Sequence, residues 1–370
     1  MERLAPVSNP AHENIGVIGL GIIGRAVAGN LRRKGFPVFV WNRSPRPVPN
    51  FVGSPGELAG LCNYIQIFVS DDEALLHTVE QLNADLTPRH VILAHSTVAP
   101  DSMRAAAAIV ERRGAQFLEA SFTGSKPAAE KGELVYYVGG TDAALREARP
   151  ILEASSKEIV HIGGIGQASA IKIATNMITA ATVQAAAEAI ALVQASGVPL
   201  EKFVDAMRVN ASYSGTLALK LPKILKRDFE PQFSVKHMLK DMQLAGQIAL
   251  SHYLDLGVTA AARDQLLEQI QWGHGDADYS AVARKYLQDA GPAPYEEPQT
   301  QEQDEQADAA EPNIALAESE ADNVAETAGL TTSQPLLAFA EPASTAPVAT
   351  TRLRRGFLKQ LFSRFSSAQK

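Results

Sequence analysis

The sequence predicts an α/β fold: a doubly wound parallel sheet, followed by an all-α domain and a disordered C-terminal tail. Short apolar segments alternate with helix-compatible segments up to residue 162, which is typical of a parallel sheet covered on both faces. A long apolar segment without proline follows at 167–196, and Pro, Glu, Gln, Ala, Ser and Thr dominate after residue 290. We therefore expect an N-terminal extension, two domains, a linker and a terminal helix, with boundaries at 1–13, 14–164, 165–290, 291–350 and 351–370.

Length and composition indicate a soluble protein with two hydrophobic cores. The 370 residues suffice for two domains, and an apolar fraction of 46% is ordinary for globular proteins. The single cysteine, Cys62, excludes an intrachain disulfide and fits a reducing compartment. Residues 1–13 lack the apolar segment of a signal peptide, and no uninterrupted apolar stretch is long enough to cross a bilayer. We therefore expect a cytoplasmic protein.

Charge is concentrated at the end of the chain. Residues 291–350 hold 12 acidic and no basic residues, whereas 351–370 hold six basic and no acidic ones. The rest is nearly neutral, which argues against a large nucleic-acid surface. Within 351–370, apolar residues recur at helical spacing among the basic ones, which predicts a short basic amphipathic helix. Such a helix suits an anionic membrane surface or an acidic groove on a partner protein; the alternative is a solvated tail.

The first strand leads into a glycine-rich turn. An apolar run at 15–18 precedes Gly19-Leu20-Gly21-Ile22-Ile23-Gly24, and a helix-compatible segment follows at 25–34. In a Rossmann-type dinucleotide-binding unit, the first glycine permits the tight turn and the second lets backbone N–H groups approach a pyrophosphate. The third lets the helix pack closely on the sheet. The alternative is a glycine-rich turn in some other strand–helix unit.

The second strand, 36–41, ends at Asn42-Arg43-Ser44. A dinucleotide fold meets the adenosine ribose about 20 residues beyond the glycines, and an NAD enzyme favours Asp or Glu there. This chain has neither, and Arg43 can pair with a 2′-phosphate through a charge-assisted contact. We therefore expect NADP(H), with NAD(H) possible; a solvent-facing arginine in a turn is the alternative.

Further strands are expected at 64–69, 90–94, 116–120, 134–138 and 158–162. Ser70 or Asp71 is expected to cap the helix after the third strand. His95-Ser96-Thr97 follows the fourth strand, at the edge where open α/β sheets bind ligands. His95 there is either an acid–base group or a structural hydrogen-bonding residue. The loop at 121–127 contains hydroxyls, a glycine and a lysine, which suit a carboxylate ligand.

Two polar residues stand out in the long apolar helix. Lys172 and Asn176 are four positions apart and therefore share one helix face, while their neighbours are Ala, Ile, Thr and Met. A buried lysine is costly unless it has partners or a chemical role. The alternative is a lysine whose stem lies on the core while its ammonium reaches water.

The order of these motifs resembles the β-hydroxyacid dehydrogenase family, which includes 3-hydroxyisobutyrate dehydrogenases. The resemblance covers about residues 14–290 and includes 95–100, 124–128, Lys172-x-x-x-Asn176 and 233–241. Segments 42–44 and 124–128 and the pattern Phe233-x-x-Lys236-His237 look most like the glyoxylate/succinic semialdehyde reductase branch.

The resemblance implies a role for each motif. Lys172 is implied as the catalytic residue and Asn176 as the residue that places the substrate. The implied substrate-binding residues are Ser96, Thr97, Thr123, Gly124, Ser125, Phe233 and Asp241. The implied cofactor-binding residues are Gly19, Leu20, Gly21, Ile22, Ile23, Gly24, Asn42, Arg43, Ser44, Val69, Ser70, Thr97 and Lys240. No metal is implied, and relatives that pair their subunits imply a homo-oligomer.

These observations predict an NADPH-dependent reductase of small aldehyde acids such as glyoxylate, succinic semialdehyde or tartronate semialdehyde. An alternative is NAD-dependent oxidation of 3-hydroxyisobutyrate or another β-hydroxyacid. A second alternative is a non-catalytic binding or scaffold protein on the same fold. The family usually has Ala-Pro-Val-Ser-Gly where this chain has Ala120-Ser121-Phe122-Thr123-Gly124, which leaves the identity of the substrate open but not the reaction class.

Overall fold

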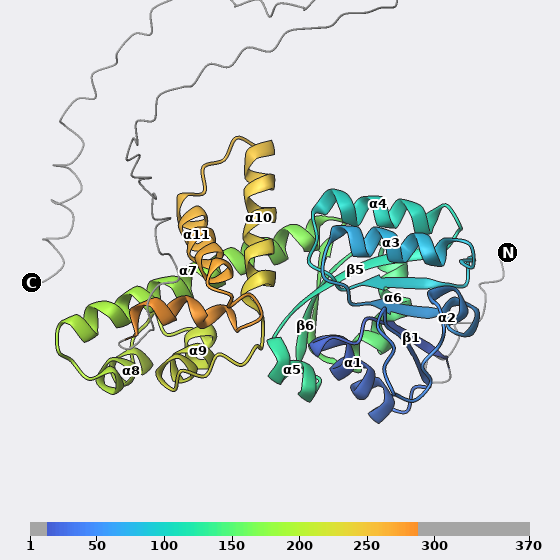
Figure 1. Ribbon diagram of the computed structural model, residues 1–370. Helices are drawn as coiled ribbons and strands as arrows, with labels where there is room; N and C mark the ends of the chain where they lie inside the picture. The colour runs from blue at the N-terminus through green and yellow to red at the C-terminus, as the bar shows by residue number, and fades with distance from the viewer. Residues whose placement is uncertain (1–12, 288–370) are drawn as a thin grey trace, which may run out of the picture. The chain divides into compact units, whose positions relative to one another are not determined.

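Seven strands form one sheet in residues 13–287, the part of the chain that this computed structural model describes (Figure 1). Their order across the sheet is β2-β1-β3-β4-β5-β6-β7. All neighbouring pairs are parallel except β5 and β6, so the predicted parallel sheet is confirmed with one antiparallel pair. The strands are β1 (Ile15–Ile18), β2 (Val38–Trp41), β3 (Tyr64–Ile67), β4 (Val91–Ala94), β5 (Gln116–Thr123), β6 (Leu134–Gly139) and β7 (Ser156–Gly163).

Helices cover both faces of the sheet. Because successive side chains of a strand point to opposite faces, β1 contributes to two cores: Ile15 and Val17 to one, Ile18 to the other. The first core includes side chains from α1 and α6, and the second includes side chains from α3 and α4. The helices of this part are α1 (Ile22–Arg33), α2 (Pro55–Leu61), α3 (Asp72–Asn83), α4 (Pro100–Glu111), α5 (Ser125–Lys131) and α6 (Asp142–Glu153).

The region after Ala120 differs from the sequence prediction. Residues 121–123 continue β5 instead of starting a loop, and α5 forms from Ser125. The reason is tertiary: this end of β5 pairs with β6, with Thr123 opposite Val135, and pairing satisfies its backbone hydrogen-bonding groups. The expected cap of α3 is confirmed, because Asp71 accepts a hydrogen bond of 2.9 Å from the backbone N–H of Ala74.

The described residues after β7 form helices, as predicted. Their common core contains side chains from all six of these elements, including Val183 of α7, Leu221 of α9 and Met238 of α10. They are α7 (Gln167–Ala195), α8 (Leu200–Arg208), α9 (Gly215–Leu225), α10 (Val235–Ser251), α11 (Gly257–Gln271) and the 3₁₀ helix η2 (Tyr279–Tyr286).

Helix α7 links the sheet to the helical core. Its first part contacts β5, β6 and β7, and its later turns contact α9, α10, α11 and η2. By length and composition α7 could cross a membrane, although polar residues such as Thr175 and Glu188 interrupt its apolar stretch. However, Lys172, Asn176 and Gln184 are buried within the fold, which identifies α7 as the central helix of a protein core.

All the described residues belong to one compact unit. The boundary expected at 164/165 falls between the end of β7 and the start of α7, and it stays a prediction. The linker at 291–350, the terminal segment 351–370 and all but the last residue of the N-terminal extension lie outside the described residues.

A buried ion pair fixes the chain segment that enters α10. The ammonium of Lys220 lies 2.8 Å from the carboxylate of Asp278, and both side chains are almost fully buried. The same carboxylate accepts hydrogen bonds from the backbone N–H groups of Gln232 and Phe233 and from the hydroxyl of Ser280. One carboxylate therefore holds α9, the loop before α10 and η2 together.

Candidate active site

The three glycines of the first turn have different surroundings. Gly19 has a φ of +92°, and a Cβ there would lie 2.0 Å from the carbonyl oxygen of Phe68. A Cβ on Gly24 would lie 1.9 Å from the carbonyl oxygen of Gly19. By contrast, a Cβ on Gly21 would meet nothing within 4 Å. The fold therefore requires Gly19 and Gly24, whereas Gly21 faces open space at the N-terminus of α1, where a pyrophosphate fits the free N–H groups.

Replacing Gly21 with valine is therefore expected to leave the fold intact and remove most dinucleotide binding. The side chain meets no neighbour, so the free energy of unfolding should change by no more than about 0.5 kcal/mol. The same side chain would occupy the space beside the N–H groups of α1. Fluorescence titration with NADPH and chemical unfolding measure the two effects. Gly24→Ala is the matched control, which should lose both stability and NADPH binding. A Gly21→Val protein that binds NADPH normally would contradict the assignment.

Asn42 supports the glycine turn directly. Its side-chain oxygen accepts a hydrogen bond of 2.9 Å from the backbone N–H of Leu20, and its amide donates to the carbonyl of Ser44. Asn42 therefore fixes the turn, and Arg43 beside it is exposed. These contacts place the end of β2 next to the glycines, as the sequence predicts.

Several predicted cofactor residues gather at the carboxyl edge of the sheet. The backbone N–H of Val69 donates a hydrogen bond of 3.1 Å to the hydroxyl of Ser96, which joins the ends of β3 and β4. Lys240, from α10, donates to the carbonyl oxygen of Thr97. The pKa of the Asp71 carboxyl is lowered: burial raises it, but hydrogen bonds from Ser70 and the Ala74 backbone and the charges of Lys240 and Arg43 outweigh that effect.

Lys172 begins a continuous series of polar contacts. Its ammonium donates a hydrogen bond of 2.9 Å to the side-chain oxygen of Asn176. The amide of Asn176 donates in turn to the carboxylate of Asp241, at 2.6 Å. The other oxygen of Asp241 lies 2.8 Å from the ammonium of Lys240. Helices α7 and α10 thus hold two lysines, an amide and a carboxylate in one row, in which Lys172, Asn176 and Asp241 are buried and Lys240 is half-buried.

The environment of Lys172 tunes its acidity. Burial lowers the pKa of the ammonium to about 8; the carboxylate of Asp241 opposes this shift and the charge of Lys240 adds to it. The amine is therefore mostly protonated at neutral pH. It becomes mostly deprotonated as the pH rises above about 8. Only one hydrogen bond from this ammonium is formed within the described residues, to Asn176, so its remaining N–H groups are available to a substrate. A group of this kind can act as a general acid.

His95 does not have the properties of an acid–base group. Its ring is buried and stacked on Phe68, with ring centroids 4.3 Å apart, and its Nδ1 lies 2.8 Å from the carbonyl oxygen of Ala120. Burial lowers the pKa of His95 to about 3, which exceeds the opposing effect of the hydrogen bond. His95 is therefore neutral, and of the two interpretations the structural one holds.

The predicted substrate loop lies at the end of β5. Gly124 and Ser125 both have positive φ angles, of 129° and 57°. Phe233 lies in the loop before α10, with its ring near those of His237 and Tyr279. Asp241 is fully buried and contacts Asn176 and Lys240, so in this structure it orients other site residues. Within the described residues, no hydrogen bond joins Thr123 or Phe233 to Lys172, and their roles stay predictions.

The sequence patterns did not single out two buried carboxylates, Asp278 and Glu119. Asp278 holds the loop that carries Phe233, and Glu119 of β5 accepts hydrogen bonds from the first turn of α7. Glu119 is the single charged residue of its strand and lies between apolar neighbours, a signal in the sequence that could have identified it. Asp278 lies in a polar turn and gave no comparable signal. Among residues 13–287, no group of three His, Cys, Asp or Glu side chains could hold a metal ion.

Comparison with known proteins agrees with this geometry. Residues 14–163 match the model of the NAD-binding domain of 6-phosphogluconate dehydrogenase, and residues 166–286 match that of the NAD-binding region of NADP-dependent 3-hydroxyisobutyrate dehydrogenase. Glyoxylate/succinic semialdehyde reductases 1 and 2 of Arabidopsis thaliana are 29% and 30% identical. These alignments cover 72% and 73% of this chain, and 96% and 78% of the relatives.

Two further matches show the range of the similarity. The Mycobacterium tuberculosis 3-hydroxyisobutyrate dehydrogenase, solved with L-serine, has a TM-score of 0.67 and 25% identity over 74% of this chain and 99% of that one. The cytokine-like nuclear factor N-PAC of Danio rerio is 28% identical over 75% of this chain and 63% of its own length. The two family models, the two plant reductases and the mycobacterial structure show that this chain belongs to the β-hydroxyacid dehydrogenase family and is an NAD(P)-dependent oxidoreductase acting on CH–OH groups.

Proposed function

We propose that this protein is an NADPH-dependent reductase of small aldehyde acids, such as glyoxylate, succinic semialdehyde or tartronate semialdehyde. The observation that carries the proposal is the polar row of Lys172, Asn176, Asp241 and Lys240. The plant relatives named as glyoxylate/succinic semialdehyde reductases support the substrate class.

The site residues divide the work of the reaction. The reduced nicotinamide, when bound, supplies the hydride. Negative charge then develops on the carbonyl oxygen, and the ammonium of Lys172 stabilises this charge and donates its proton to the oxygen. Asn176 fixes the position of the ammonium through its 2.9 Å hydrogen bond, and Asp241 fixes Asn176. Asp241 also keeps the pKa of Lys172 from falling further.

The substrate carboxylate is assigned to the end of β5. Successive backbone N–H groups in a turn conformation can form an anion-binding concavity. Gly124 and Ser125 form a turn with positive φ angles between β5 and α5, and Thr123, Ser96 and Thr97 add hydroxyl groups at the same edge of the sheet. Phe233 is proposed as an apolar wall of the same pocket.

The cofactor preference rests on the end of β2. Asn42 uses its side chain to hold the glycine turn, so no carboxylate is present there to accept a hydrogen bond from a ribose 2′-OH. Arg43 is exposed, which suits pairing with a 2′-phosphate. NADP(H) is therefore the proposed cofactor, and NAD(H) is the alternative.

A panel of aldehyde acids assayed with NADPH and with NADH tests the proposal. We expect the highest kcat/KM for an aldehyde acid with NADPH. Arg43→Ala should raise the KM for NADPH and leave that for NADH nearly unchanged, because it removes only the proposed phosphate contact. A clear preference for NADH would instead favour the alternative, an NAD-dependent 3-hydroxyisobutyrate or β-hydroxyacid dehydrogenase.

A non-catalytic scaffold role is the second candidate. The match to N-PAC, a protein named as a nuclear factor, favours it. The lowered pKa of a buried Lys172 argues for chemistry, since a scaffold gains nothing from burying an amine at a cost in solvation. If the protein turns over no compound of the panel with either cofactor, the result would support the scaffold role.

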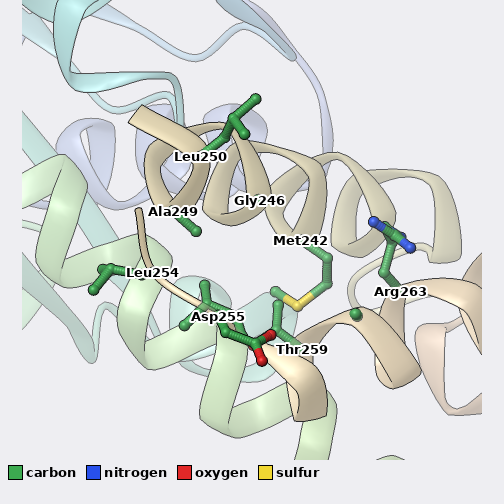
Figure 2. A pocket seen from close by; sticks show the side chains of 10 residues that line it. Met242, Gly246, Ala249, Leu250, Leu254, Asp255, Thr259 and Arg263 are labelled. Carbon is green, nitrogen blue, oxygen red and sulfur yellow. The ribbon is translucent and has the colours of Figure 1, made fainter. Parts of the chain in front are cut away.

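We also propose that the protein is a homo-oligomer. Large apolar side chains are exposed on the helical part, including Ile178 and Leu192 of α7 at 69% and Leu250 of α10 at 80%. Close to Leu250, α10 and α11 enclose a pocket of about 200 Å³ lined mostly by aliphatic side chains (Figure 2). Exposed apolar patches of this kind mark association surfaces. Light scattering should therefore give a mass of at least two chains for the wild type and a smaller mass for the Leu250→Lys variant. A monomeric wild type would contradict the proposal.

A cytoplasmic location and a role for segment 351–370 are proposals from the sequence alone. We expect that deleting 351–370 leaves kcat and KM unchanged but reduces sedimentation with vesicles that contain anionic lipid, or capture by an acidic partner. Equal behaviour of the full-length and shortened proteins would favour a solvated tail.

A further inference from the structure

The start of α7 lacks the usual cap. The residue before the helix is Gly166, which has no side chain to accept hydrogen bonds from the first turn. The backbone requires glycine there, because φ is +92° and a Cβ would lie 2.4 Å from Arg104. The free N–H groups of this turn must nevertheless find partners, since the turn is buried against the sheet. Lys172 lies only one turn further along the helix.

A carboxylate from the sheet replaces the missing cap. One oxygen of Glu119 accepts a hydrogen bond of 2.9 Å from the backbone N–H of Ala168. The other accepts from the backbone N–H of Ser169 at 3.1 Å and from its hydroxyl at 2.7 Å. These are the helix positions that a Ser or Asp cap normally serves. All these partners are donors, and a negative charge is favoured at a helix N-terminus, so the ionised carboxylate fits the site.

The surroundings leave Glu119 a single position. Its side chain is fully buried, and Gly139 faces it on the neighbouring strand β6. A Cβ on Gly139 would lie 2.2 Å from the carboxylate oxygen and 2.8 Å from the two carbons behind it. Burial raises the pKa of Glu119, and the hydrogen bonds from α7 oppose that shift.

Strand β5 connects Glu119 to the rest of the site. The next residue, Ala120, provides the carbonyl oxygen that lies against His95, at the end of β4. Four residues after Glu119, the strand ends at Thr123, where the substrate loop begins. One strand therefore leads directly into the predicted substrate residues 123–125 and, through Glu119, holds the first turn of α7.

We propose that Glu119 is a positioning residue, which sets the axial and rotational position of α7 and thereby places the Lys172 ammonium relative to the substrate loop. The inference rests on the proposed function, because it gives Lys172 its part in the reaction. Glu119 itself touches neither substrate nor cofactor.

Glu119→Gln is the primary variant. It keeps the shape of the side chain but removes the charge and turns an N–H group toward N–H donors. We expect kcat to fall roughly 10- to 100-fold, because a displacement of about 1 Å has effects of this size. The NADPH dissociation constant should stay unchanged, since the glycine turn and α1 are not involved. The apparent pKa near 8 in the pH profile should move, because Lys172 loses its alignment with Asn176 and Asp241.

Two further variants distinguish a positioning effect of Glu119 from a general loss of folded structure. Gly139→Ala leaves Glu119 chemically intact but displaces it, and should reproduce the fall in kcat. Ser169→Ala removes one of the donors and keeps both backbone contacts, so its kcat should stay within about threefold of wild type. If Glu119→Gln does not fold, the kcat, KM and kinetic pKa of Gly139→Ala test the proposal instead. A folded variant of either kind with wild-type kcat, KM and kinetic pKa would overturn the proposal.

Two measurements do not depend on turnover. Hydrogen exchange at the amides of Ala168 and Ser169 should be faster in Glu119→Gln, and the pH dependence of chemical labelling at Lys172 should shift. If the wild type reduces no aldehyde acid, the proposed function fails while these measurements still test the effect of Glu119 on Lys172. Unchanged labelling of Lys172 in a variant with faster amide exchange would show that Glu119 acts on the fold alone.

Discussion

Replacing Lys172 with alanine is expected to lower kcat for aldehyde reduction by about 10²- to 10⁴-fold, the usual contribution of a positioned general acid. The variant lacks both the proton donor and the positive charge that stabilises the developing oxyanion. NADPH binding should remain close to wild type, because the glycine turn is formed by β1, α1 and Asn42. Steady-state kinetics and a fluorescence titration with NADPH measure the two quantities.

The matched control for Lys172 is Thr179→Ala, on the same helix. Thr179 donates its hydroxyl proton to the backbone carbonyl of Thr175 and not to the polar row, so its loss should change kcat by less than about twofold. A Lys172→Ala enzyme as active as this control would refute the catalytic assignment. It would also remove the main argument against a scaffold.

The pH profile gives an independent check on Lys172. With a pKa of about 8, the free enzyme carries the proton below this pH and loses it above. kcat/KM for reduction should therefore be level below pH 8 and fall about tenfold per pH unit above it. In the oxidation direction the neutral amine acts as a base, so kcat/KM for oxidation should rise with pH up to the same pKa. A reduction profile that stays flat to pH 10 would contradict the role of this group.

Replacing Lys220 with methionine is expected to destabilise the fold by about 3–5 kcal/mol, because it leaves the Asp278 carboxylate buried without its cation. The double variant Lys220→Met/Asp278→Asn should be less destabilised than the single one, since no uncompensated charge remains. Urea unfolding measures these differences. Arg208→Met is the control: its ion pair with Asp205 is exposed, so the expected loss is at most about 1 kcal/mol.

The Lys220 variant should also affect the site. Asp278 holds the backbone N–H of Phe233, so a displaced carboxylate should raise the KM for the aldehyde acid more than that for NADPH. A stability loss below 1 kcal/mol, or equal changes in both KM values, would contradict the role given to this ion pair.

Much of the fold was predictable because its signals are local. Alternating short strands and helices, the glycine turn and the Asp71 cap each depend on a few adjacent residues, and the structure confirms them. The antiparallel pairing of β5 with β6 depends on residues apart in sequence, so the length of β5 was underestimated. The terminal segments, outside the described residues, were assigned from composition alone.

The sequence by itself determined the fold class, the family and the shared face of Lys172 and Asn176, because helical spacing places residues four apart on one side. Only the tertiary structure decided what surrounds that face. Asp241 and Lys240 reach it from α10, and burial among them lowers the pKa of Lys172 to about 8. It also decided that His95 is a buried, neutral residue and that Glu119 supplies the cap α7 lacks. Burial and partners from distant parts of the chain set these properties, and no local pattern contains them.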